Sequence, residues 1–222
     1  MAASYATMAQ GTPRRAFLGA QVEAVKDGLK VVAVAGGTAQ LLKLEAGDVV
    51  QQINGEAVAD MPGLVALLAR YRAGDEVTMK VLRKGQVLNP NGKFAARPAE
   101  QVATGELLYD DAPYKGGKLR VLINKPSSKT KLPAMLFIPG YTCSSIDNLP
   151  DVHPYKRIVD AYVKAGFVTL RIEKSGLGDS YNTPACESTD LYDEINSFEA
   201  GLIKLKSLPY VDTTKIIIVG HS

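Results

Sequence analysis

The residues best placed to do chemistry are Gly220, His221 and Ser222, which directly follow an apolar run. This run, from Ile216 to Val219, is mostly β-branched, a pattern typical of a buried parallel strand that is covered on both faces. Glycine before serine permits a sharp strand-to-helix turn, which lifts the serine hydroxyl clear of the sheet. In a complete Gly-x-Ser-x-Gly motif the second glycine would come two positions after the serine. We therefore consider Ser222 a candidate nucleophile for acyl transfer, provided that its surroundings support that role.

Two other turns must lie beside this serine if it belongs to a site. Residues 139–143 follow the apolar run 134–138, and residues 173–180 follow the strand-like run 167–171. With helical stretches between them, these strands predict a parallel sheet wrapped by helices. Ligands of such sheets bind beyond the carboxyl ends of the strands, so we expect the three turns to converge on one crevice.

Two amphipathic helices are predicted to connect these strands. The first covers residues 155–165, because its apolar residues recur with helical spacing on one face. The second begins after a cap supplied by Thr189 or Asp190. Its predicted buried stripe consists of Leu191, Ile195, Phe198, Leu202 and Leu205. Upstream of both helices, residues 106–109 and 119–123 predict two strands that begin the sheet in antiparallel fashion.

Residues 103–222 resemble the first half of the α/β-hydrolase family. The resemblance rests on a strand followed by Pro-Gly-Tyr, a strand followed by Glu-Lys-Ser-Gly-Leu-Gly-Asp-Ser, and the strand that ends in Gly-His-Ser. It is closest to bacterial serine esterases and peptidases that carry a Gly-His-Ser-x-Gly-Gly turn. The resemblance implies that Ser222 is the nucleophile and that a backbone N–H at Tyr141 or Gly140 stabilises the oxyanion.

In that family the triad acid and base follow the serine along the chain, so both would lie beyond residue 222. His221 is the variable residue of the turn and His153 precedes a helix, so we interpret both as structural or surface histidines. Because a serine without a base is a weak nucleophile, we expect the chain as given to be inactive. We interpret Glu173 and Asp179 as fixing their loop through backbone N–H groups, not as a paired acid site.

Cofactor and metal sites find little support in the sequence. A Gly-Leu-Gly at residues 176–178 follows a strand, but Tyr181 stands where a dinucleotide-binding fingerprint has its third glycine. We therefore predict no cofactor. Cys143 and Cys186 are too few for a zinc site. They lie on two of the converging loops, where they form either a disulfide or two free thiols.

The first hundred residues show short strands and turns with one main helix. Asn54-Gly55 is a strong hairpin signal, and residues 61–72 predict a helix. Residues 14–88 resemble a bacterial PDZ domain of the HtrA protease type, although residues 36–40 depart from the Ser-Pro-Ala that is usual there. The resemblance rests on the order of the segments at 44–50, 53–58 and 73–77.

The PDZ resemblance implies a peptide-binding groove. PDZ domains add a peptide strand to a sheet edge and hold its terminal carboxylate on backbone N–H groups. By this match, Phe17, Leu18 and Gly19 form the carboxylate loop, and Leu64 and Leu68 form the side-chain pocket. Alternatively, these apolar residues belong to the core, and the domain acts as a docking or gating wedge that binds no free peptide.

We therefore expect a β-rich PDZ domain followed by an α/β domain whose sheet is mostly parallel. The predicted divisions are a flexible lead at 1–13, the PDZ domain at 14–88, a linker at 89–102 and half of a hydrolase domain at 103–222. Together the resemblances imply a serine hydrolase that cleaves a small ester or a peptide through an acyl-serine. The alternative is a peptide-binding adaptor with a non-catalytic scaffold.

Composition narrows the remaining possibilities. The chain has 222 residues, of which 46% are hydrophobic and 22% charged, values typical of a soluble globular protein. The net charge of +3 comes without an Arg/Lys stripe interleaved with aromatic residues, so nucleic acid is not an expected partner. No apolar run approaches membrane-spanning length. A disulfide would place the protein outside the cytoplasm, and the HtrA-like segment also favours a periplasmic or secreted location.

Overall fold

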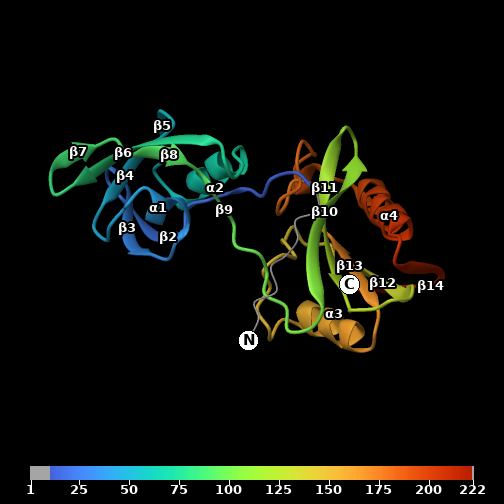
Figure 1. Cartoon of the computed structure of the whole chain (residues 1–222). Coiled ribbons are helices and arrows are strands. Elements are labelled where there is room, and N and C mark those ends of the chain that lie inside the picture. The colour runs from blue at the N-terminus through green and yellow to red at the C-terminus, as the bar shows by residue number, and fades with distance from the viewer. Residues whose placement is uncertain (1–10, 222) are drawn as a thin grey trace. The chain divides into compact units, whose positions relative to one another are not determined.

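The computed structural model describes residues 11–221 and divides into two compact units (Figure 1). The N-terminal unit consists of Pro13–Pro98. The sheet unit contains residues 99–221 together with residues 11–12. Residues 1–10 and Ser222 lie outside the described residues, so the predicted nucleophile and most of the predicted lead have no structural description.

The N-terminal unit is built on an antiparallel sheet with the order β2-β3-β4-β6-β7. Strand β5 pairs with β4, β8 pairs with β6, and β1 pairs with β9. Two-residue turns at Asn54-Gly55 and Lys84-Gly85, all with positive φ, close two of the hairpins. The elements are β1 Ala16–Phe17, β2 Ala20–Val25, β3 Gly28–Val34, α1 Gly37–Leu41, β4 Val49–Ile53, β5 Glu56–Ala57, α2 Met61–Ala69, β6 Glu76–Arg83, β7 Gln86–Leu88, β8 Asn91–Lys93 and β9 Ala95–Ala96.

The stretch 89–98, which we predicted to belong to a linker, is part of this unit. It supplies β8 and β9, and the side chain of Phe94 is buried in the unit's core. The backbone N–H of Phe94 donates to Asp75 O, while Gly74 N–H donates to Phe94 O. Phe94 is the residue of this segment that is buried in the core, so the segment shows no apolar periodicity. This explains why its sequence pattern suggested a linker.

The sheet unit contains a five-stranded sheet with the order β10-β11-β13-β12-β14. The pairs β10–β11 and β11–β13 are antiparallel, whereas β12–β13 and β12–β14 are parallel. The described sheet is therefore mixed, not mostly parallel, because the hairpin closed at residues 115–116 contributes two antiparallel strands on one side. The elements are β10 Glu106–Tyr114, β11 Gly117–Lys125, β12 Leu132–Ile138, α3 Pro154–Lys164, β13 Val168–Ile172, the 3₁₀ turn η1 Cys186–Ser188, α4 Leu191–Ser207 and β14 Val211–Gly220.

The two long helices cover opposite faces of this sheet. Alternate residues of a strand point to opposite faces. Met135 and Phe137 of β12 pack with α3, whereas Leu136 packs in the cluster that includes Leu205 of α4. Asp190 caps α4 by accepting a hydrogen bond of 2.8 Å from Asp193 N–H, which decides between the two predicted caps.

The buried face of α4 differs from the predicted stripe. Leu205 is buried and Phe198 and Leu202 are partly buried, but Leu191 and Ile195 are exposed. The residues buried along the helix are Ser197, Gly201 and Leu205, and Gly201 lies against the side chain of Ile172. Small residues allow α4 to approach β13 closely, which an analysis of apolar spacing does not detect.

Thr12 is held by the sheet unit and not by the N-terminal unit. Its backbone N–H and hydroxyl donate to Asp111 Oδ2 at 2.6 and 2.8 Å, and its carbonyl accepts from Arg120 Nη2. This part of the predicted flexible lead is therefore anchored. Within the described part of the chain, no helix is both long and apolar enough to cross a membrane.

Candidate functional site

The carboxyl ends of three parallel strands meet at one edge of the sheet, as the sequence predicts. Ile138 at the end of β12 is in register with Gly220 at the end of β14, and Phe137 is in register with Arg171 of β13. The backbone N–H of His221 donates to Ile138 O at 3.1 Å. The residue that precedes Ser222 is therefore fixed beside the turn that follows β12.

The two predicted oxyanion donors differ in their availability. The N–H of Gly140 donates to the Tyr155 hydroxyl at 3.3 Å, on the side of α3. The same hydroxyl lies 3.0 Å from His221 Nδ1, so Tyr155 links the turn after β12 to the end of β14. The N–H of Tyr141 has no hydrogen-bond partner among residues 11–221, and its side chain is exposed. Tyr141 is therefore the better candidate donor.

Glu173 supports the loop that carries these donors. The residue is fully buried, and its carboxylate accepts hydrogen bonds from Ser145 Oγ at 2.5 Å and from Ile146 N–H at 3.3 Å. Gly178 makes room for it, because a Cβ there would lie 2.2 Å from Glu173 Oε1. Asp179 faces a different partner, with its Oδ2 3.8 Å from Arg120 Nε. In these contacts Glu173 holds the loop after β12 and Asp179 faces an arginine of β11, whereas we had predicted that both fix their own loop through backbone N–H groups.

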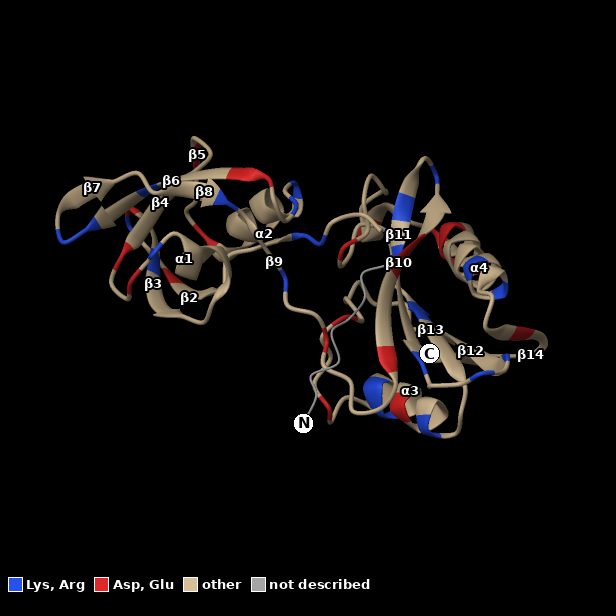
Figure 2. Cartoon of the chain, in the orientation of Figure 1, with Lys and Arg blue, Asp and Glu red and all other residues tan. Residues whose placement is uncertain are grey.

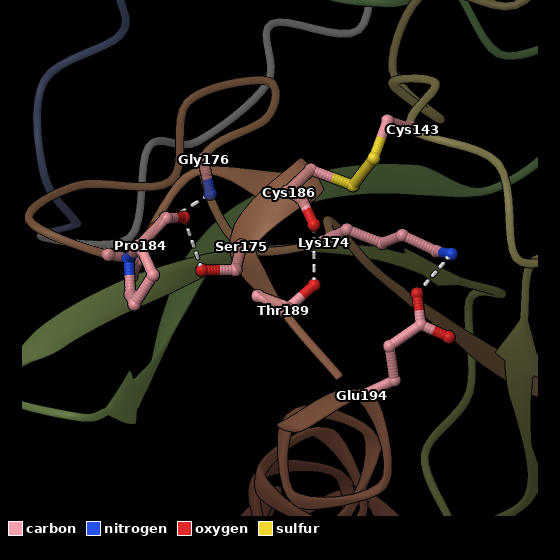
Figure 3. Close-up of a disulfide and its surroundings, with 9 residues drawn as sticks. Cys143, Lys174, Ser175, Gly176, Pro184, Cys186, Thr189 and Glu194 are labelled. Atoms are coloured by element: carbon pink, nitrogen blue, oxygen red, sulfur yellow. Dashed lines mark hydrogen bonds and ion pairs between the residues drawn. A yellow bond between two sulfur atoms is a disulfide. The ribbon is translucent and has the colours of Figure 1, made fainter. Parts of the chain in front are cut away.

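Cys143 and Cys186 form a disulfide that joins the loop after β12 to η1 (Figure 3). The loop after β13 has further tethers nearby. Ser175 Oγ donates to Pro184 O at 2.6 Å, and Lys174 Nζ lies 2.5 Å from Glu194 Oε1 of α4 (Figure 3). Two of the three converging loops are thus held by a covalent bond and by buried polar contacts.

Glu100 anchors a buried ionic cluster that the sequence analysis missed. Its carboxylate oxygens accept from the two Nη atoms of Arg171 at 2.9 and 3.0 Å and from Asn148 N–H at 3.0 Å. Lys156 Nζ of α3 lies 3.5 Å from Glu100 Oε1, and the side chains of Glu100, Arg171 and Lys156 are all buried. Figure 2 shows that basic segments occur on α3 and within the sheet of this unit.

The electrostatics of this cluster favour the ionised carboxylate. Burial alone would raise the pKa of Glu100, but the hydrogen bonds and charge of Arg171, together with the Lys156 charge, lower the pKa below its usual value. One signal of the cluster was present in the sequence. Arg171 is the one charged residue of the mostly apolar strand β13, and a buried charge requires a partner. Its partner lies 71 positions away along the chain, so it could not be identified from spacing.

In the N-terminal unit, the predicted carboxylate loop leaves two backbone donors available. The carbonyls of Phe17 and Leu18 accept from Thr38 Oγ1 and Ala39 N–H, each at 2.7 Å. The N–H groups of Leu18 and Gly19 have no hydrogen-bond partner among residues 11–221. The next strand, β2, is an edge of the sheet. The divergent segment 36–40 therefore holds the loop by its carbonyls and leaves its donors open.

The predicted side-chain pocket is only partly accessible. Leu64 is buried in the core, whereas Leu68 is partly buried against it, as is expected of a residue at the margin of a groove. Phe17 is half-buried and forms part of β1. The large apolar residues exposed on α2 are Met61 and Val65, which were not predicted as groove residues although they are spaced four residues apart.

Comparison with known proteins identifies the first of the two units. Residues 16–91 match the family model for the PDZ domain. This part of the chain is a PDZ domain. A curated relative, the probable periplasmic serine endoprotease DegP-like of Halomonas elongata, is 35% identical over 74 residues, which are 33% of this chain and 16% of the relative. The chain thus spans about a sixth of the relative's length.

Solved structures show more limited likeness. The HtrA-type protease AlgW with a decapeptide has 28% identity and a TM-score of 0.36, covering 38% of this chain and 30% of that chain. Est1E from Butyrivibrio proteoclasticus with bound ferulic acid has 24% identity and a TM-score of 0.41, covering 50% of this chain and 42% of that chain. With TM-scores this low, neither likeness establishes a function for the sheet unit.

Proposed function

We propose that this chain is part of a serine hydrolase whose sheet unit cleaves a small ester or a peptide. Ser222 would attack the carbonyl carbon, and the backbone N–H of Tyr141 would donate to the developing oxyanion. Water would then hydrolyse the acyl-serine. The observation that carries this proposal is the register of β12 with β14, which fixes His221 beside the turn that contains the available donor.

The base and the acid of the triad are proposed to follow Ser222 in the complete protein. The histidines of this chain have other contacts. His221 Nδ1 lies 3.0 Å from the Tyr155 hydroxyl, and His153 caps α3 by accepting from Tyr155 N–H at 3.2 Å. Neither is positioned by an acid of the described residues, so neither is proposed as the general base.

A fluorophosphonate probe tests this proposal. We expect covalent labelling of Ser222 in a protein that continues beyond residue 222 and supplies a histidine base, and no labelling of the chain of residues 1–222. Ser222→Ala should abolish the labelling, whereas Ser128→Ala, which removes an exposed serine hydroxyl, should leave it unchanged. Intact-mass and peptide mapping give the readout. Equal labelling of the extended protein and its Ser222→Ala variant would contradict the assignment.

The PDZ domain is proposed to capture peptide C-termini. The free N–H groups of Leu18 and Gly19 lie next to the edge strand β2, which is the arrangement that binds a terminal carboxylate and extends a sheet. The second candidate function, an adaptor with a non-catalytic scaffold, rests on this same observation. Peptide binding without probe labelling of the extended protein would favour the adaptor.

Isothermal titration with an apolar-ended decapeptide and its C-terminal amide measures this capture. We expect binding of the free acid and at least about tenfold weaker binding of the amide, since the loop then loses a charged acceptor. Gly19→Ala should also abolish binding, because a Cβ there would lie 2.2 Å from Gly36 O. Gly47→Ala is the matched control, since Gly47 also has a positive φ but nothing lies within 4 Å of its Cβ position. Equal affinities for acid and amide would contradict carboxylate capture.

We propose a location outside the cytoplasm, periplasmic or secreted. Disulfides persist in oxidising compartments and are rare in the cytosol of mesophiles. The Cys143–Cys186 bond is the support for this proposal.

A further inference from the structure

The PDZ domain has a cavity whose lining shares no residue with the predicted carboxylate loop or with α2. It has a volume of about 330 Å³ and is lined by residues that follow α1 and by residues of β6 and β7. In the strand order of the sheet, β7 is the edge opposite to β2. The volume is at the lower end of the range of about 300–1,000 Å³ that is usual for small-molecule sites. The cavity therefore suits a ligand smaller than a drug-sized molecule.

The walls of this cavity are mainly aliphatic. Leu42 and Leu44 come from the segment after α1, Val81 from β6 and Leu88 from β7. The first three are buried, and Leu88 is half-buried. An unbranched hydrocarbon chain matches such a lining, because it would remove these apolar surfaces from water without leaving polar groups unpaired.

Of the two basic side chains that line the cavity, Arg83 is paired with acids and Lys43 is not. Arg83 is fully engaged: it donates to Asp48 at 2.7 and 2.8 Å, to Glu45 Oε1 at 2.7 Å and to Lys43 O at 2.9 Å. Two carboxylates thus face one guanidinium, so Arg83 offsets only one of their two negative charges. The ammonium of Lys43 has no ion pair or hydrogen bond within residues 11–221, and neither does the exposed side-chain amide of Asn89. The rim thus offers an ammonium and an amide donor that no carboxylate of residues 11–221 binds.

We propose that this cavity binds a medium-chain aliphatic carboxylate. Its hydrocarbon tail lies on Leu42, Leu44, Val81 and Leu88, and its carboxylate lies at the Lys43 ammonium and the Asn89 amide. At about 30 Å³ for each water-sized group, the cavity holds about ten non-hydrogen atoms, the number in octanoate. This site is independent of the proposed hydrolase and peptide-binding functions, since it shares no residue with the carboxylate loop or with α2.

Isothermal titration of the full chain with sodium octanoate, octylamine hydrochloride and 1-octanol tests the proposal. For octanoate we expect a dissociation constant on the order of 0.1–1 mM, as suits a small ligand in a half-open site. Octylamine should bind at least about tenfold more weakly, because its charge is repelled by Lys43. The uncharged alcohol should bind with intermediate affinity.

Two asparagine variants separate the role of Lys43 from general effects of charge. Lys43 has a φ of 56°, a region in which asparagine is better tolerated, so Lys43→Asn should fold. It should weaken octanoate binding about fivefold, the effect of losing one partly exposed ion pair, and leave octanol binding unchanged. Lys26→Asn, at an exposed lysine in the turn between β2 and β3, is the matched control and should bind octanoate normally.

The proposal would be overturned if octanoate did not bind at concentrations up to 10 mM, which is about tenfold above the expected range. It would also be overturned if octanoate bound the Lys43→Asn and Lys26→Asn variants with equal affinity. Binding of octylamine as tight as that of octanoate would be a third contradiction. A competition titration distinguishes the two sources of an aliphatic carboxylate. Addition of the apolar-ended decapeptide should leave octanoate affinity unchanged. Displacement of octanoate by the peptide would assign the binding to a peptide C-terminus and contradict a separate site.

Discussion

Glu100→Gln is expected to lower the free energy of unfolding of the sheet unit by about 3–5 kcal/mol at pH 7, because the buried charge of Arg171 loses its carboxylate partner and Lys156 loses the buried one of its three nearby carboxylates. Urea denaturation followed by circular dichroism measures the loss. Hydrogen exchange with mass spectrometry should assign it to peptides within residues 99–172. Glu106→Gln is the matched control, since Glu106 is 3.9 Å from Lys125 in a partly exposed pair, and its effect should stay below about 1 kcal/mol.

The same substitution should change how stability depends on pH. The pKa of Glu100 is lowered in the folded protein, so its contribution is fully present above the unfolded pKa, which is near 4.5. The contribution is lost as the pH falls through the lower folded value. The difference between wild type and Glu100→Gln should therefore be large at pH 7 and shrink in strongly acidic solution. A difference that stayed constant down to the most acidic pH would show that the carboxylate charge is not responsible.

Reduction of the Cys143–Cys186 disulfide is expected to lower the free energy of unfolding by about 4 kcal/mol, because the bond closes a loop between residues 43 positions apart. Urea denaturation of the oxidised protein and of protein treated with a dithiol reductant measures this difference. The double variant Cys143→Ser and Cys186→Ser should behave like the reduced protein. The same unfolding midpoint with and without the reductant would contradict the expectation.

The effect of reduction should be confined to the sheet unit. The PDZ domain contains no cysteine, so its peptide affinity should not change on reduction. Within the sheet unit, hydrogen exchange should accelerate most in residues 139–148 and 176–190, the two loops that the disulfide joins. Faster exchange spread evenly over both units would indicate general destabilisation instead of a released loop.

Both predictions concern the same loop after β12. Its distal part is held by Glu173 through Ser145 and Ile146, and by Glu100 through Asn148. Its proximal part, residues 141–144, is exposed and is attached elsewhere by the disulfide. The candidate oxyanion donor Tyr141 therefore lies just before two anchors of different chemistry, first the disulfide at Cys143 and then the contacts of Glu173 and Glu100 at residues 145–148.

Much of the secondary structure could be predicted from local pattern. The predicted strands 106–109, 119–123 and 134–138 lie within β10, β11 and β12, because runs of mostly apolar residues define such strands. Helix α2 ends at Ala69, three residues earlier than predicted, and Arg72 forms an isolated bridge with Arg15 instead. The last predicted turn of the helix does not form, because Arg72 pairs with a residue that is distant in the sequence. Rules based on local sequence do not include such contacts.

The candidate site could be predicted only in outline. The convergence of the strand ends follows from the order of strands and helices, so the turns at 139–143 and 220–222 could be brought together without coordinates. The hydrogen bond from Gly140 N–H to the Tyr155 hydroxyl could not be predicted, because it depends on the rotation of α3 about its own axis. Glu100 was assigned to a linker, since nothing nearby in the sequence indicates that it meets Arg171.

The two ends of the PDZ domain are hydrogen-bonded neighbours, and this has an evolutionary consequence. Strand β1 pairs with β9, and Arg14 Nη1 donates to Pro98 O at 2.8 Å. The flanking residues Thr12 and Glu100 are each anchored in the sheet unit. A domain whose first and last residues lie close together can be inserted into another domain, or removed from it, without displacing the strands of that domain. The PDZ domain therefore has the topology of a module inserted between Thr12 and Ala99 of the sheet unit.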